Sequence, residues 1–198
     1  FIAECKSCIE LRGSGQASKI TDNLIGAGYN GYSIYARNFG GLLVTANNIF
    51  PRGASSIHLG VMRSSVTGNR FHSFYPGMLV FQDNCSENLV SSNHFLRDHE
   101  PWPPMQPMTM VWMLYGLLYI SGNHNSIIAN HISESIAARY IKPSGAVPVI
   151  IHVAAGQGNY ISSNHIVAST EAPGRMAQEA SGTQAGDSDP CFSAQVGA

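Results

Sequence analysis

Two carboxylates close together in the chain are the residues best suited to catalysis. Asp98 and Glu100 share a strand-like stretch with Arg97 and His99, and because side chains alternate along a strand, both carboxylates are expected to point to one side. Two carboxylates can divide acid–base work, one as the acid and the other as the base or nucleophile, as they do in glycosidases. Asp98 and Glu100 are therefore the predicted catalytic residues. The alternative interpretation pairs Asp98 with Arg97 or Arg70 and leaves Glu100 solvated.

Aromatic and hydrogen-bonding side chains nearby suit a sugar ligand. Arg70, His72 and Tyr75 lie close together in the chain and combine donors with aromatic faces that fit a furanose ring. Trp102 is flanked by prolines, so a stiff loop is expected to expose it for stacking on sugar or on an adjacent subunit. We predict Arg70, His72, Tyr75, Arg97, His99 and Trp102 as substrate-binding residues. Packing between neighbouring turns of the chain is the alternative for Phe74 and Tyr75.

Composition favours a neutral polar ligand. The chain has 198 residues, 44% of them hydrophobic, and no apolar run of about 18 residues, which predicts one soluble globular domain without a membrane span. Only 12% of the residues are charged and the net charge is −1, so a broad basic surface for nucleic acid is not expected. Many Ser, Asn, Gly, Tyr and His residues remain, and they suit hydrogen bonding to carbohydrate.

Cysteines and histidines do not predict a metal site. The single Cys5-x-x-Cys8 motif lacks the second pair that a structural zinc site needs, and with Cys85 and Cys191 it makes no disulfide framework. Three histidines recur at one position of a repeat, which predicts a structural ladder rather than metal ligands: His94, His131 and His165.

A repeated unit positions these side chains. An apolar pair, two small residues, an asparagine and another apolar residue recur around five positions: Asn47, Asn69, Asn93, Asn130 and Asn164. The intervals of roughly 20 to 40 residues are those of solenoid repeats. Each unit is interpreted as a short strand that turns at the asparagine, whose amide can bond the backbone of a bend and which tolerates the left-handed conformation.

A second apolar run separates successive units, at residues 56–59, 78–81, 117–120 and 149–153. Each coil therefore has at least two strands, and stacked coils pair equivalent strands around one apolar interior. This pattern predicts a right-handed parallel β-helix. A β-sandwich is the alternative, and a helical solenoid is disfavoured because no long stretch has a period near 3.6.

The ends of the chain predict a fragment. Residues 1–170 are assigned to β-helix coils, residues 171–190 to a flexible loop rich in small and polar residues, and residues 191–198 to the start of a further strand. The chain begins with Phe1, shows no signal peptide, and neither end supplies an evident cap for the solenoid.

Three strings resemble the inulin fructotransferase family, which forms difructose dianhydrides. They are GLLVTANNIFPRG at residues 41–53, RFHSFYPGM at residues 70–78 and NHFLRDHEPW at residues 93–102. The resemblance runs from about Ile20 to Val167, in a family whose members are about twice this length. It implies a pectin-lyase-like β-helix, a homotrimer, bacterial secretion and no cofactor.

The same resemblance implies cleavage of the terminal difructose from β-2,1-linked fructan by intramolecular fructosyl transfer. Levan as the substrate, or hydrolysis of a difructose dianhydride by a related enzyme, are alternatives within the family. The resemblance implies an acidic stretch after the Asp-His-Glu-Pro-Trp string and a further acidic residue after the next strand. This chain departs from that pattern, with Met105–Met113 in place of the acidic stretch and Ser121 in place of the further acid. A local frameshift is one hypothesis for the difference, and a non-catalytic fructan-binding protein is the other.

Overall fold

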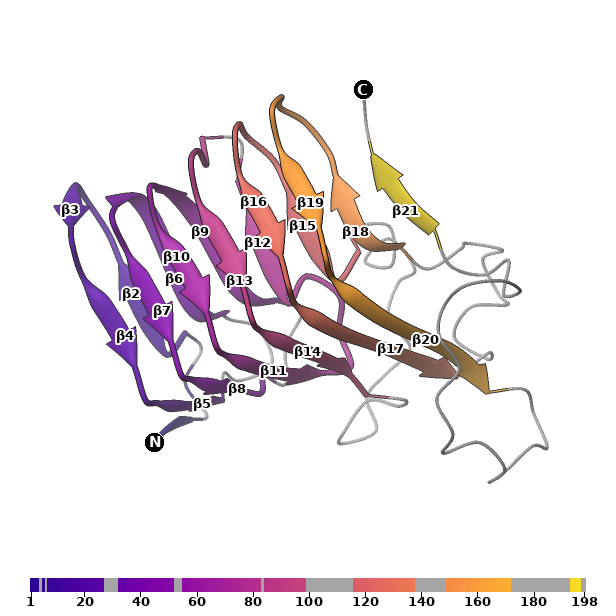
Figure 1. Cartoon of the computed structure of the whole chain (residues 1–198). Helices are drawn as coiled ribbons and strands as arrows, with labels where there is room; N and C mark the ends of the chain where they lie inside the picture. The colour runs from indigo at the N-terminus through magenta and orange to yellow at the C-terminus, as the bar shows by residue number, and fades with distance from the viewer. Residues whose placement is uncertain are drawn as a thin grey trace.

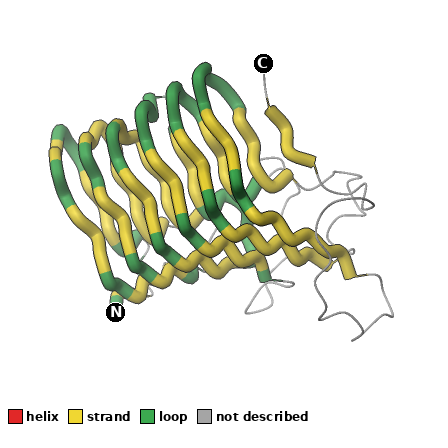
Figure 2. Tube along the Cα trace, in the orientation of Figure 1, coloured by secondary structure: helices red, strands yellow, loops and turns green. Residues whose placement is uncertain are grey.

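The computed structural model describes residues 1–3, 5, 7–26, 32–51, 55–82, 84–98, 116–137, 149–171 and 193–196. These residues form three parallel sheets wound into stacked coils, and the structure confirms the predicted right-handed parallel β-helix (Figures 1 and 2). Each complete coil contributes strands to all three sheets, so a coil has at least three strands where the sequence predicted at least two. Among the described residues no helix reaches the length and apolar character that crossing a membrane takes.

Sheet B contains β2 (Ile9–Leu11), β3 (Gly15–Gln16), β6 (Tyr32–Gly40), β9 (Ser55–Met62), β12 (Leu79–Phe81), β15 (Leu118–Ile120), β18 (Val149–Val153) and β21 (Ser193–Val196). Sheet C contains β4 (Lys19–Thr21), β7 (Leu43–Thr45), β10 (Ser65–Thr67), β13 (Leu89–Ser91), β16 (Ser126–Ile128) and β19 (Tyr160–Ser162). Sheet A contains β1 (Ile2–Ala3), β5 (Leu24–Gly26), β8 (Asn48–Ile49), β11 (Arg70–Ser73), β14 (His94–Arg97), β17 (His131–Ala137) and β20 (His165–Glu171). Within one coil the chain passes from sheet B to sheet C and then to sheet A.

The apolar interior is built from residues at matching positions of successive coils. In sheet A the inward row includes Ile49, Phe71, Phe95 and Ile132, which pair in register and have no exposed surface. The rings of Phe71 and Phe95 stack with their centroids 4.5 Å apart. Because side chains alternate along each strand, the residues between these face outward, and this outward row carries the candidate site.

The predicted asparagine ladder is confirmed at the corner between sheets C and A. The Nδ2 atom of each asparagine donates to the Oδ1 atom of the next: Asn47 to Asn69 at 3.0 Å, Asn69 to Asn93 at 3.0 Å, Asn93 to Asn130 at 2.9 Å and Asn130 to Asn164 at 2.9 Å. The backbone N–H of each donor asparagine also donates to the same Oδ1 atom. The buried amides therefore join the coils as well as forming their turns.

The left-handed residue at this corner precedes the asparagine, so the conformational role predicted for the asparagine itself is wrong. Ala46, Gly68, Ser92, Ala129 and Ser163 have φ between 53° and 63°. An alanine there carries a steric cost of about 1–2 kcal/mol, whereas the asparagine remains in an ordinary conformation and directs its amide inward.

Ala46→Gly is expected to raise the free energy of unfolding by about 0.5–1 kcal/mol, because glycine removes the strain at φ 56° at a smaller entropic cost. The urea midpoint of unfolding measures the change. Ala36→Gly, in buried strand β6, is the matched control and is expected to lower the midpoint. A lower midpoint for both variants would contradict the assigned strain.

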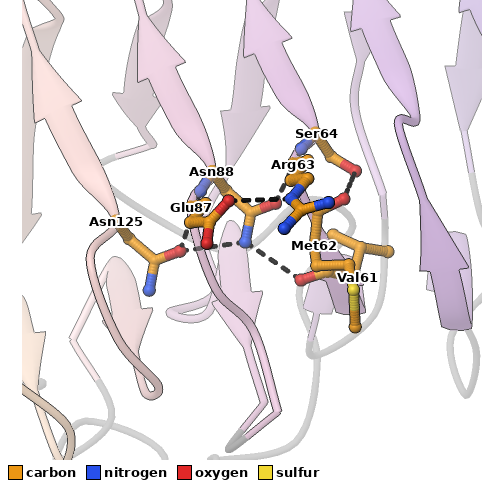
Figure 3. Close-up of polar contacts among 7 residues, drawn as sticks. All are labelled: Val61, Met62, Arg63, Ser64, Glu87, Asn88 and Asn125. Atoms are coloured by element: carbon orange, nitrogen blue, oxygen red, sulfur yellow. Dashed lines mark hydrogen bonds and ion pairs between the residues drawn. The ribbon is translucent and has the colours of Figure 1, made fainter.

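A second ladder stands at the corner between sheets B and C and was missed in the sequence. The Nδ2 atom of Asn88 donates to the Val61 carbonyl at 3.0 Å and to Asn125 Oδ1 at 2.9 Å, and Oδ1 of Asn88 accepts from the N–H of Ser64. These contacts are drawn in Figure 3. Asn125 continues the ladder to Asn159 at 3.1 Å. Two corners of the described coils, the one between sheets C and A and the one between sheets B and C, are thus held by amides.

The number of residues per coil differs along the β-helix, but in each coil the contacts of the two ladders span the same number of residues. Successive contacts in the Asn47 ladder join residues 22, 24, 37 and 34 apart in sequence. The contacts at the corner between sheets B and C repeat these intervals, from the N–H of Leu42 to the Ser64 hydroxyl, from the N–H of Ser64 to Asn88, and on to Asn125 and Asn159. Most of the extra residues lie between β14 and β15 and between β17 and β18. Added length therefore enters mainly on the passage from sheet A to sheet B.

Candidate functional site

The candidate site lies where strands β11 and β14 of sheet A end. Asp98 follows β14, and its backbone N–H donates to the Ser73 carbonyl at 3.0 Å, which continues the pairing of the two strands by one residue. Its carboxylate forms a close ion pair with Nε2 of His72. About a third of each side chain is exposed, 34% for His72 and 36% for Asp98. The pair therefore combines fixed geometry with access to a ligand.

A second ion pair lies inside the coil beside the first. Nη1 of Arg97 lies 3.1 Å from Oε2 of Glu134, and both side chains are almost fully buried. Nε of Arg97 donates to the Phe74 carbonyl at 2.7 Å, and the guanidinium lies 5.5 Å from the centroid of the Phe74 ring. Arg97 thus connects β14 to β17 and to the turn after β11.

Burial and Arg97 act in opposite directions on the pKa of Glu134. Burial raises the pKa of this carboxyl, and the charge and hydrogen bond of Arg97 lower it. The Oε1 atom is buried and has no hydrogen-bond partner among the described residues. Because a buried charge is costly without full pairing, Glu134 depends strongly on Arg97.

The structure brings together some of the predicted site residues. His72 and Asp98 form the ion pair, which replaces both of the partners considered for Asp98, Arg97 and Arg70. Arg97 is 2% exposed and Tyr75 is 7% exposed, so they lie behind the surface and would act on a ligand by positioning other groups.

Arg70 remains on the outer face of sheet A, where Nη1 donates to Asn48 Oδ1 at 3.3 Å. Its place in the outward row keeps it available to a ligand near His72. His99, Glu100 and Trp102 lie outside the described residues, as does the stretch Met105–Met113.

Glu134 was not singled out by sequence reasoning. Its partner Arg97 is 37 residues away, and only the stacking of β14 on β17 places the two side chains together. The sequence carried one sign that the two residues lie side by side. Arg97 and Glu134 each stand three residues after the histidine that follows a ladder asparagine.

The histidine row confirms the predicted structural ladder. His94, His131 and His165 pair in register on the outer face, with ring centroids 4.9 Å and 4.8 Å apart. Nδ1 of His131 and Nδ1 of His165 lie 3.1 Å apart, a hydrogen bond in which one ring donates. No group of three or more His, Cys, Asp or Glu side chains in the described parts of the chain has an arrangement suited to a metal ion.

The row is expected to make stability depend on pH. Burial lowers the pKa of His94, and the charges of His131, Arg70 and His72 lower it further. A pKa below the unfolded value of about 6.5 means that the folded state binds the proton less readily. The stabilising contribution of neutral His94 is therefore present above pH 6.5 and is lost as the pH falls through the folded pKa.

Urea midpoints at pH 7.5 and pH 5.5 test this expectation, and His94→Gln is expected to show a smaller loss than the wild type. Burial also lowers the pKa of His58, so part of the loss should remain in the variant. Equal losses in the two proteins would show that His94 does not contribute.

The chemical capacity of the site lies in its carboxylate. Asp98 can accept a proton from a hydroxyl group, and the imidazole of His72 holds it in place and can stabilise its charge. Arg97 and Glu134 fix the ends of the strands that carry this pair. The arrangement suits acid–base chemistry on a neutral hydroxylated ligand.

Comparison with known proteins identifies the family of this chain. The family described as the β-helix repeat of inulin fructotransferase matches residues 92–190. The inulin fructotransferase [DFA-I-forming] of Arthrobacter globiformis is 42% identical over 173 residues, covering 87% of this chain and 42% of that protein. The chain thus spans about two fifths of the length of this curated relative.

Two solved structures agree with the assignment. The crystal structure of DFA-IIIase from Arthrobacter chlorophenolicus A6 is 56% identical with a TM-score of 0.79, covering 98% of this chain and 48% of that chain. The same enzyme in complex with DFA-III is 66% identical over 84% of this chain and 38% of that chain, with a TM-score of 0.79. Taken together with the stacked coils and the match over residues 92–190, these similarities show that the chain belongs to the inulin fructotransferase family of β-helix proteins.

Proposed function

We propose that the protein containing this chain acts on β-2,1-linked fructan, cleaving the terminal difructose by intramolecular fructosyl transfer to give a difructose dianhydride. Membership of the inulin fructotransferase family carries the proposal. Structures of the related DFA-IIIase in complex with GF2 and with DFA-III support a ligand of this class. Water is not the acceptor in this reaction.

The reaction assigns distinct tasks to the site. The glycosidic C–O bond breaks, a new C–O bond forms to a hydroxyl of the same difructose unit, and the anomeric carbon passes through an oxocarbenium-like state. Asp98 takes the proton of the attacking hydroxyl, and His72 holds the carboxylate. We assign protonation of the leaving oxygen to Glu100, which stands two residues further along the chain.

A second function within the family is favoured by sequence identity. The identity to DFA-IIIase in complex with DFA-III is 66%, against 42% to the DFA-I-forming inulin fructotransferase. Opening of a difructose dianhydride by water would use the same carboxylates, with water replacing the internal hydroxyl. The same intramolecular transfer on levan is a third alternative within the family.

A fructan-binding protein without turnover is the candidate from another class. The acid expected after the strand at residues 117–120 is replaced by Ser121, which is fully buried at the end of β15. Such a protein would bind fructan and form no product.

Separate incubations with inulin, levan and DFA-III, followed by chromatography, distinguish these functions. A cyclic difructose product from inulin would support the proposed transferase, and a linear difructose product from DFA-III would support the hydrolase. Binding of inulin without any product would replace both with the fructan-binding function. Homotrimer formation and secretion stay predictions, and size-exclusion chromatography with light scattering tests the first of them.

A further inference from the structure

A depression with a volume of about 480 Å³ opens on sheet B, away from the His72–Asp98 pair. Its walls are formed by polar and aromatic side chains of β2, β6 and the residues beside them: Glu10, Arg12, Tyr32, Tyr35, Arg37 and Asn38. The volume lies within the range of small-molecule sites, about 300–1,000 Å³. Nothing in the chemistry assigned to Asp98 uses these residues.

Three rings form one wall of this depression and its continuation onto the next coil. Tyr32 and Tyr35 have centroids 5.4 Å apart, and His58 lies 5.0 Å from Tyr32 and 5.8 Å from Tyr35. Burial lowers the pKa of His58, which favours the uncharged form of its ring. The cluster therefore presents uncharged faces, which are suited to stacking against the C–H groups of a sugar.

An outward row of side chains, aromatic except for Val80, continues from these rings along the axis of the β-helix. Tyr35, His58, Val80, Tyr119 and His152 pair in register on the outward side of sheet B. Tyr119 and His152 meet edge to face, with centroids 5.3 Å apart. One outward side chain per coil gives a repeat of about 4.8 Å, a track along which an extended polymer can lie.

The polar groups of the depression include one carboxylate, two guanidinium groups and an amide. Glu10 forms an ion pair with Arg12, with Oε2 2.6 Å from Nη2 and 2.9 Å from Nε. The Glu10 carboxylate offsets the charge of Arg12, and the carboxylate, the two guanidinium groups and the amide together offer both acceptors and donors to sugar hydroxyls.

We propose that this depression and the ring row form a second carbohydrate site, which binds a stretch of the fructan chain distant from the reacting end. The choice of fructan rests on the proposed function. The depression lies on β2 and β6 of sheet B, whereas His72 and Asp98 lie on sheet A, one coil and two coils beyond β6. It holds the polymer on the protein while the terminal difructose reacts elsewhere.

Binding of long-chain inulin, measured by isothermal titration calorimetry on the full chain, tests the site. Tyr35→Ala and Arg37→Ala are each expected to weaken binding by about three- to tenfold, as loss of one aromatic or polar contact implies. Tyr160→Ala is the matched control, because Tyr160 is 59% exposed on sheet C, and it is expected to bind inulin as the wild type does. Circular dichroism and thermal unfolding confirm that each variant is folded.

The outcomes separate this site from the proposed reaction. Selective weakening in Tyr35→Ala and Arg37→Ala supports the site even if no variant, nor the wild type, forms product. The proposed site would be overturned by wild-type affinity in both variants or by equal weakening in Tyr160→Ala. Absence of inulin binding, or equally strong binding of dextran, would also overturn it. Since exposed Arg37 can be replaced without disturbing the core, failure of Tyr35→Ala to fold would leave Arg37→Ala to decide.

Discussion

Replacement of Asn69 by alanine is expected to lower the free energy of unfolding by about 3–5 kcal/mol. The Nδ2 atom of Asn69 donates to Val44 O, Thr67 O and Asn93 Oδ1, and its Oδ1 atom accepts from the N–H and Nδ2 of Asn47. All of these groups lie in a corner where Asn69 is 2% exposed. Alanine would remove the five bonds and leave buried donors and acceptors unpaired, which is the costly case.

Urea denaturation followed by circular dichroism measures this loss, and Asn48→Ala provides the control. Asn48 lies two residues after the left-handed Ala46, on the outward row of sheet A, and accepts one hydrogen bond of 3.3 Å from Arg70. Its replacement is expected to change stability by less than about 1 kcal/mol. Similar losses in the two variants would show that the ladder contributes no more than an exposed surface contact.

Replacement of Asp98 by asparagine is expected to reduce product formation at least about 100-fold in the full enzyme, with little change in folding. Asparagine keeps the shape of the side chain but cannot accept the proton, and it loses the ionic part of the contact with His72. The measurement is the initial rate of product release from inulin and from DFA-III. The loss should fall on kcat more than on KM if Asp98 acts in the chemical step.

Glu87→Gln is the control for Asp98. Glu87 is an exposed carboxylate that pairs with Arg63 at 2.8 Å on another corner of the coil, and Figure 3 shows this contact beside the Asn88 ladder. Removing its charge is expected to leave the rate unchanged. A rate for Asp98→Asn within about threefold of the wild type would exclude Asp98 as the base and direct attention to other carboxylates.

Sequence reasoning succeeded where one coil repeats the next. The asparagine at the end of each sheet C strand recurs with the same neighbours, and so the ladder, the parallel sheets and the histidine row could be predicted. The left-handed residue was assigned one position too late, although Gly68 before Asn69 was a direct sign of its place. The second ladder also had a sign, because Asn88, Asn125 and Asn159 each precede a ladder asparagine at a constant separation.

The contacts of the site could not be read from the repeat. His72 and Asp98 were both candidates, but their pairing depends on how β11 lies against the end of β14. The Arg97–Glu134 pair crosses from one coil to the next, and local sequence gives both residues the character of surface charges. Burial in the interior, which converts them into a positioning pair, follows only from the stacked structure.

The uneven lengths of the coils have a consequence for evolution and for protein engineering. Because both amide ladders keep the same intervals, a peptide added between β14 and β15 or between β17 and β18 changes no amide contact. A single residue added between Asn88 and Asn93 would instead displace one ladder relative to the other. New recognition loops can therefore be grafted on the passage from sheet A to sheet B, while the short segment between the ladders does not tolerate insertion.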